Sequence, residues 1–172
     1  MIKLADKTID DKDYKVLINF LKKKSYLTQS KVTKKFEEKF SKKLDTKYSI
    51  FVNSGSSANL LAFQCLINPY RKKRLKKNDE ILIPALCWST SLWPIVQSGL
   101  KPKFVDIDID TLNINLKDLE KKITTKTKAI MLVHVLGNCT NMDELMKIKK
   151  KNKLFLVEDT CESLGTKFKK KY

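Results

Sequence analysis

The stretch Phe51-Val-Asn-Ser-Gly-Ser-Ser-Ala-Asn-Leu-Leu61 decides how this chain is predicted to fold. An apolar run over residues 48–52 stops at a polar turn, and the apolar spacing of a helix begins after the turn. The pattern predicts a strand, a tight turn and a helix. Gly55 permits a turn that a Cβ would hinder, and Ser56 or Ser57 can cap the helix.

The start of this predicted helix is a candidate anion site. The free N–H groups of its first turn point into the polar turn, where the helix dipole and the serine hydroxyls favour negative charge. The alternative is an ordinary strand-to-helix loop whose serines only cap the helix, and the local pattern alone favours that alternative. The remainder of the chain must distinguish the two.

Length and composition indicate one domain or part of a larger protein, because 172 residues with 42% hydrophobic content suffice for a sizeable core. There is no apolar run of about 18 residues, and the amino terminus is too polar for a signal peptide. We therefore expect a cytoplasmic protein without membrane association. The cysteines are far apart and His134 is the only histidine, so we expect reduced thiols and no metal site.

The formal net charge of +17 raises the hypothesis of a nucleic-acid partner. Of the 36 basic residues, however, only Arg71 and Arg74 are arginine, the residue whose bidentate fork reads bases and phosphates. The lysines are spread over four of the six predicted helices and the loops between them. This distribution favours a lysine-rich surface, and a basic nucleic-acid-binding module stays as an alternative.

Hydrophobic periodicity predicts strands that alternate with helices after two amino-terminal helices, which implies a right-handed parallel α/β sheet. The predicted helices are residues 11–24, 32–44, 57–68, 91–98, 116–123 and 142–151. The predicted strands are residues 48–52, 80–83, 103–107, 129–135 and 154–157.

Ligands of such sheets bind beyond the carboxyl ends of the strands, so the residues that follow each strand are candidates. The turn after residue 52 offers an anion cradle and Trp88 offers a flat face. Asp159 offers a carboxylate to a ring nitrogen, and His134 offers a hydrogen bond. These groups suit a planar, phosphorylated, nitrogen-containing ring, a description that fits pyridoxal phosphate.

Several segments, in order and at the expected spacings, resemble the DegT/DnrJ/EryC1/StrS sugar aminotransferase family. They are Leu27-Thr-Gln29, Asn53-Ser-Gly-Ser-Ser-Ala-Asn-Leu60, Pro84-Ala-Leu-Cys-Trp-Ser-Thr90, residues 94–102, Val105-Asp106, His134-Val-Leu-Gly137 with Met142-Asp143, and Glu158-Asp-Thr-Cys-Glu-Ser-Leu-Gly165. The resemblance implies an α/β, mostly parallel sheet: the large domain of the pyridoxal-phosphate-dependent aspartate aminotransferase-like fold, here truncated. It implies an amino-terminal helical segment at residues 1–46 and the first part of the cofactor-binding domain at residues 47–172.

The resemblance also implies a cofactor, pyridoxal 5'-phosphate or pyridoxamine 5'-phosphate, and roles for particular residues. The phosphate turn of the family falls on Gly55, Ser56 and Ser57. Trp88 matches the aromatic residue that stacks on the cofactor ring, although a tryptophan after a strand is usually part of the core.

Three further residues follow from the resemblance. Asp159 matches the carboxylate that pairs with the pyridine nitrogen and keeps it protonated, with a helix cap as the alternative. Glu162 falls where many relatives carry glutamine near the ring hydroxyl. His134 is a possible catalytic residue, but a lone histidine after a strand is more often structural.

The family's Schiff-base lysine lies further beyond Asp159 than the chain extends, so no residue up to Tyr172 is assigned that role and this segment alone is expected to be inactive. A lysine there implies sugar transamination, with glutamate as the expected amino donor, in surface polysaccharide or glycoconjugate (lipopolysaccharide) biosynthesis. A histidine implies a 4-keto-6-deoxysugar 3-dehydrase. Transamination is the expectation on family grounds, whereas the motifs resemble the dehydrase-like branch. The resemblance also implies a homodimer. The alternative to an enzyme is a non-catalytic fragment.

Overall fold

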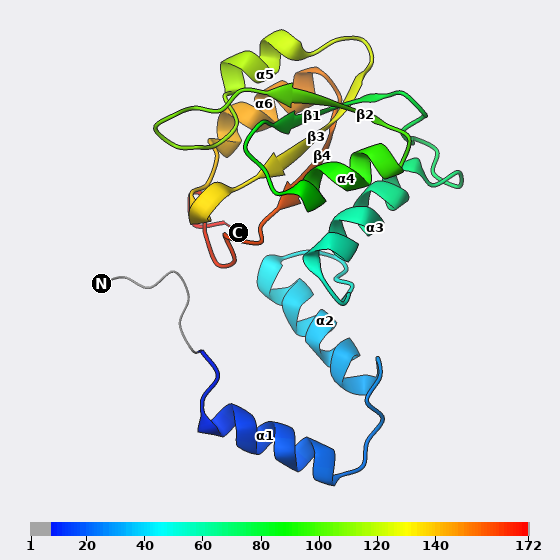
Figure 1. Cartoon of the computed structure of the whole chain (residues 1–172), viewed down its shortest axis with the longest axis vertical. Helices are drawn as coiled ribbons and strands as arrows, with labels where there is room; N and C mark the ends of the chain where they lie inside the picture. The colour runs from blue at the N-terminus through cyan, green and yellow to red at the C-terminus, as the bar shows by residue number, and fades with distance from the viewer. Residues whose placement is uncertain (1–7, 172) are drawn as a thin grey trace. The chain divides into compact units, whose positions relative to one another are not determined.

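The computed structural model describes residues 8–171 and has two compact units, Met1–Phe51 and Val52–Tyr172 (Figure 1). Within residues 8–171, no helix combines the length and the apolar character needed to cross a membrane.

The first unit contains helices α1 (Asp11–Lys22) and α2 (Lys31–Leu44). The start of α1 is fixed by a capping box, in which Asp10 accepts hydrogen bonds from the backbone of Asp13 and Asp13 accepts one from the backbone of Asp10. In α2 a four-residue spacing brings Phe36 against Phe40, with ring centroids 5.5 Å apart. Phe51 packs edge-on against Phe36 at 5.4 Å.

The predicted strand at residues 48–52 is wrong, because this segment is irregular and pairs with no strand among the described residues. A strand needs a neighbour that takes its backbone hydrogen bonds. Here side chains of the first unit take them instead. Glu37 Oε1 accepts from the N–H of Phe51 at 2.7 Å, and Gln29 Nε2 donates to the Phe51 carbonyl at 3.1 Å.

The second unit is a parallel sheet covered by helices, as predicted. Its strands lie in the order β2-β1-β3-β4, and every pair of neighbours is parallel. The strands are β1 (Glu80–Pro84), β2 (Lys101–Val105), β3 (Thr127–Val133) and β4 (Phe155–Asp159). The helices are α3 (Gly55–Ile67), α4 (Ser89–Gln97), α5 (Leu116–Lys122) and α6 (Met142–Lys151), with a 3-10 turn, η1, at Val135–Gly137.

Alternation along the strands divides the core of this unit into two layers, one on each face of the sheet. Leu82 of β1 joins the cluster that contains Leu119 of α5 and Leu145 of α6. Its neighbour Ile81 points the other way, into the cluster with Phe63 of α3 and Ile95 of α4. Helices α5 and α6 therefore cover one face and α3 and α4 cover the other (Figure 1).

Polar side chains cap α3, α5 and α6. Asn115 caps α5 and Asn141 caps α6. The α3 cap is Ser54, not Ser56 or Ser57, because the Ser54 hydroxyl accepts the N–H of Ser57 while its own backbone stays extended. Gly55 is consequently the first helical residue, and its φ is not in the left-handed region that would require glycine.

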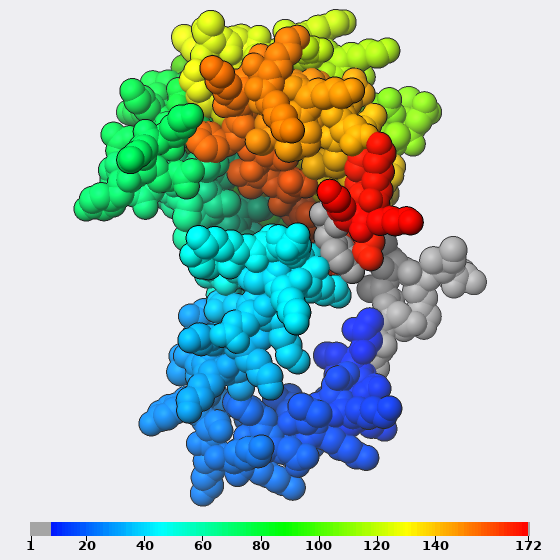
Figure 2. Space-filling view, turned by 180° about the vertical axis from the view of Figure 1, so that it is seen from behind, coloured from blue at the N-terminus to red at the C-terminus, as the bar shows by residue number. Residues whose placement is uncertain are grey.

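Lysines gather at helix carboxyl ends, where they face the negative end of the helix dipole. The last turn of α6 carries Lys149, Lys150 and Lys151, and the last turn of α5 carries Lys121 and Lys122. Residues around α6, in orange, form much of the visible surface of the second unit in Figure 2. Part of the lysine excess therefore stabilises helix ends.

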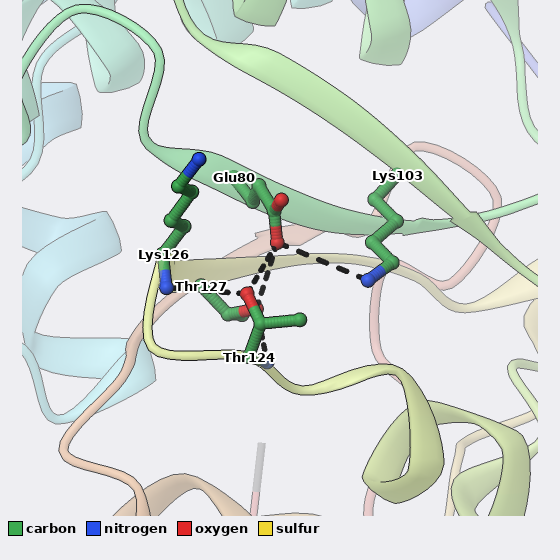
Figure 3. Close-up of polar contacts among 5 residues, drawn as sticks. All are labelled: Glu80, Lys103, Thr124, Lys126 and Thr127. Carbon is green, nitrogen blue, oxygen red and sulfur yellow. Dashed lines mark hydrogen bonds and ion pairs between the residues drawn. The ribbon is translucent and has the colours of Figure 1, made fainter.

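A polar cluster closes the amino ends of the central strands (Figure 3). Glu80 Oε2 accepts hydrogen bonds from Thr124 Oγ1 at 2.7 Å and Thr127 Oγ1 at 3.4 Å, and Lys103 Nζ lies 3.9 Å away. The Thr124 hydrogen bond lowers the pKa of Glu80 below its ordinary value. Partial burial opposes this shift, and Lys103, Thr127 and Lys126 add to it.

Glu80→Gln tests this cluster. A carboxylate whose pKa is lowered on folding stabilises the fold above its unfolded pKa, and this contribution is lost as pH falls through the folded pKa. We expect the variant to lose about 1 kcal/mol of unfolding free energy at neutral pH and much less at about pH 3. Urea denaturation at both pH values measures the difference.

Glu120→Gln is the matched control, because Glu120 pairs with Lys151 in an exposed salt bridge. This control is expected to change stability little at either pH. If the Glu80 variant lost the same unfolding free energy at both pH values, the stabilising role of the Glu80 charge would be contradicted.

Candidate active site

A cavity of about 370 Å³ lies at the carboxyl edge of the sheet, within the second unit. It brings together the start of α3, the loop after β1, the end of β3 and the end of β4, as the parallel topology predicts. Its lining residues are Gly55, Ser56, Asn59, Leu86, Cys87, Trp88, Thr90, Ser91, Val133, Val135, Asp159, Cys161 and Glu162.

The first turn of α3 forms the anion-favouring end of the cavity. The N–H groups of Gly55 and Ser56 lie in this turn, and such N–H groups have no carbonyl partner within the helix. The turn contains no acidic residue, so the positive end of the helix dipole is not neutralised there. A Cβ on Gly55 would meet nothing within 4 Å, so the glycine leaves open space there. Ser57 does not line the cavity, and its hydroxyl accepts a hydrogen bond from Ser54 Oγ at 3.1 Å.

Asp159, the last residue of β4, places a carboxylate in the cavity wall. Its Oδ2 accepts from Asn59 Nδ2 at 2.9 Å and from Ser91 Oγ at 2.8 Å. Its Oδ1 accepts the N–H of Cys161 at 3.1 Å. One carboxylate therefore links β4 to both helices at the cavity.

Trp88 lies directly before α4 and lines the cavity with a largely exposed side chain, 74% accessible. This exposure excludes a place in the hydrophobic core and leaves a flat aromatic face free. Val133 at the end of β3 and Val135 at the start of η1 add apolar surface. The cavity thus offers an anion-favouring end, an aromatic face and a carboxylate, which are the features of a site for a flat, charged ring.

Glu162 lines the cavity and is held by the backbone of η1, since its Oε2 accepts the N–H of Leu136 at 2.6 Å. Leu136 has a φ of 53°, a left-handed conformation that is rare for leucine. The hydrogen bond to Glu162 helps to hold this turn.

His134 does not reach the cavity. It is 5% exposed, its Nδ1 accepts the N–H of Thr140 at 3.3 Å, and its Nε2 lies 3.2 Å from Glu158 Oε2. Because Nδ1 accepts, Nε2 carries the proton that is donated to Glu158. The arrangement matches the structural alternative for this histidine.

Two cavity residues, Asn59 and Ser91, were missed by the sequence analysis. Each is a buried polar residue one helical turn before a buried apolar one: Asn59 precedes Phe63, and Ser91 precedes Ile95. A polar residue on the buried face of a helix needs a hydrogen-bond partner, and this need is the signal in the sequence that could have identified both residues. The sequence does not reveal that the partner of both is Asp159, because Asp159 is 100 residues from Asn59 and 68 residues from Ser91.

Two of the four cysteines, Cys87 and Cys161, also line the cavity, and all four are free thiols. Burial raises the pKa of the Cys87 thiol, and the negative charge of Asp159 raises it further. Burial and Glu158 likewise raise the pKa of Cys139. Among the described residues, no three His, Cys, Asp or Glu side chains are grouped so that they could hold a metal ion.

The fold and the cavity define an α/β protein with a ligand site at the carboxyl edge of a parallel sheet. The chain belongs to the DegT/DnrJ/EryC1/StrS aminotransferase family, whose model matches residues 7–172. The predicted family is thereby confirmed.

Curated relatives include two GDP-4-keto-6-deoxy-D-mannose 3-dehydratases. The one from Escherichia coli is 46% identical over 98% of this chain, and the one from Yersinia pseudotuberculosis is 40% identical over 95%. A GDP-perosamine synthase from Escherichia coli is 37% identical over 80% of the chain. The chain spans only 43%, 41% and 36% of the lengths of these relatives.

Solved structures confirm the predicted fold class. The Escherichia coli 3-dehydratase with bound hydrated pyridoxal phosphate superposes with a TM-score of 0.92 at 46% identity, over 98% of this chain and 43% of that one. A 3-dehydratase with a trapped pyridoxal-phosphate–glutamate geminal diamine gives 0.93 at 45% identity, over 99% and 44%.

The thiols provide a test of the cavity wall. Because the thiolate is the reactive form, the raised pKa of Cys87 and Cys139 should slow their alkylation. We expect iodoacetamide at about pH 8 to modify the exposed Cys65 and Cys161 roughly tenfold faster, as measured by peptide mass spectrometry. In urea the four rates should become similar. Equal rates for Cys87 and Cys161 in the folded protein would refute the described surroundings of Cys87.

Proposed function

We propose that this chain is the cofactor-binding, amino-terminal part of an enzyme that uses pyridoxal or pyridoxamine phosphate and acts on nucleotide-linked keto sugars. The observation that carries the proposal is the convergence on one cavity of the α3 amino terminus, the exposed face of Trp88 and the Asp159 carboxylate.

The residues present fit this cofactor. The N–H groups of Gly55 and Ser56 would hold the phosphate, with Ser57 supporting the turn through Ser54. Trp88 would cover the ring, and Asp159 would hold the proton on the ring nitrogen. The bound ring supplies an electron sink for the carbon that loses a proton.

Glu162 completes the proposed set. It lines the same cavity, and its Oε2 is already bonded to the Leu136 N–H, which leaves Oε1 for the ring hydroxyl. His134 is given no direct role, because its side chain lies elsewhere and both ring nitrogens have partners.

For the reaction we propose 3-dehydration of a GDP-4-keto-6-deoxy sugar, with glutamate as the amino donor. The support is that two 3-dehydratases align with 95% or more of this chain at 40% identity or higher, and one solved 3-dehydratase carries a glutamate adduct of the cofactor. Transamination is the second candidate, since a GDP-perosamine synthase is 37% identical over 80% of the chain.

The organisation of the whole protein is also a proposal. We assign residues 1–46 to a helical segment and residues 47–172 to the first part of the cofactor-binding domain. A homodimer is supported by the exposed apolar side chains of α1, a helix without a buried residue. Surface polysaccharide biosynthesis is supported by a relative named for lipopolysaccharide biosynthesis, and we assign this activity to the cytoplasm as part of the same proposal.

Cofactor binding is the direct test. The natural gene product that contains these residues, titrated with pyridoxal phosphate, should show saturable binding by absorbance and by quenching of tryptophan fluorescence. Asp159→Ala should raise the dissociation constant by about tenfold to a hundredfold, because a charge-assisted contact is lost. Asp110→Ala, an exposed aspartate in a turn, is the matched control.

Product analysis separates the two candidate reactions. With a GDP-4-keto-6-deoxy sugar and glutamate, mass spectrometry should find a sugar that has lost the 3-hydroxyl, whereas an added amino group would favour transamination. A wild-type protein that does not bind the cofactor would overturn the whole proposal.

A further inference from the structure

We propose that Asn59 and Ser91 are positioning residues that fix the Asp159 carboxylate so that its Oδ1 is the oxygen offered to the ring nitrogen of the cofactor. This inference rests on the proposed function and deepens it. It concerns two residues that contact Asp159.

The hydrogen-bond capacity of the Asp159 carboxylate is unequally used by its two oxygens. Each carboxylate oxygen accepts about two hydrogen bonds in its plane. Oδ2 already receives two, from Asn59 Nδ2 at 2.9 Å and from Ser91 Oγ at 2.8 Å. Oδ1 receives one described bond, from the N–H of Cys161 at 3.1 Å. The remaining capacity for a donor from the cavity therefore lies on Oδ1.

Both donors are fixed in direction. The Asn59 amide also donates to the Thr90 carbonyl at 3.4 Å, so its NH₂ group faces the carboxylate and the first turn of α4. Asn59 is 8% exposed and Ser91 is 0% exposed, so water does not compete for these bonds. The carboxylate is held from two helices and cannot rotate without breaking buried bonds.

Ser91 is the third residue of α4. A serine in a helix commonly bonds the carbonyl three or four residues back in the chain. Ser91 instead donates to a residue 68 positions away, at the tip of β4. Both α3 and α4 therefore aim a buried donor at the same oxygen, and both also contribute residues to the cavity lining.

A purely structural role makes a different prediction. If the hydrogen bonds of Asn59 and Ser91 only stabilised the fold, loss of these side chains would lower stability and leave the absorbance of the bound cofactor unchanged. If they position Asp159, their loss also changes how firmly the ring nitrogen keeps its proton, which is visible in the absorbance of the bound cofactor as pH is varied.

The experiment compares Ser91→Ala and Asn59→Leu with two matched controls in the natural gene product. Ser98→Ala removes a hydroxyl at the end of α4, and Gln64→Leu removes an amide from α3; these two side chains contact each other at 3.4 Å and not Asp159. For each variant, the dissociation constant of pyridoxal phosphate and the pH titration of the bound cofactor's absorbance are measured, with the thermal midpoint recorded in parallel.

We expect Ser91→Ala and Asn59→Leu each to raise the dissociation constant by about tenfold and to shift the absorbance titration to lower pH, while the controls match the wild type. If Asn59→Leu does not fold, Ser91→Ala decides alone. Variants that bind the cofactor with the wild-type titration overturn the inference and leave the proposed function standing. A wild-type protein that binds no cofactor overturns both.

Discussion

The hydrogen bonds to the Asp159 carboxylate are the constraint on which the site depends. They tie the tip of β4 to Asn59 of α3 and Ser91 of α4. Two helices that cover the same face of the sheet thereby start at fixed positions around the cavity. Without this shared acceptor, the buried Ser91 hydroxyl would lose its described partner and Asn59 would keep only the long bond to the Thr90 carbonyl, which is costly.

The two ends of the parallel sheet have different roles. At the amino ends, Glu80 joins β1 to the turn before β3 through Thr124 and Thr127, and its contacts are local and stabilising. At the carboxyl ends, polar groups are directed into a cavity. Between the ends, alternate side chains such as Leu82 and Ile83 fill opposite layers of the core. The layered core supports a site that needs exact side-chain positions.

Sequence patterns predicted the elements whose causes are local. The boundaries of α6 follow from its periodicity and from Asn141 at its cap, and the apolar run in β3 follows from burial on both faces. The strand expected at residues 48–52 failed because pairing depends on a neighbour, which periodicity does not reveal. The Asp159 network was missed for a related reason: its partners are far apart in sequence and meet only when the sheet is assembled.

The most direct test of the central claim is a crystal structure of the natural gene product with pyridoxal phosphate bound. We expect the phosphate within hydrogen-bond distance of the Gly55 and Ser56 N–H groups, the ring against Trp88, and the ring nitrogen beside Oδ1 of Asp159. A cofactor bound elsewhere, or one whose ring nitrogen points away from Asp159, would contradict the claim.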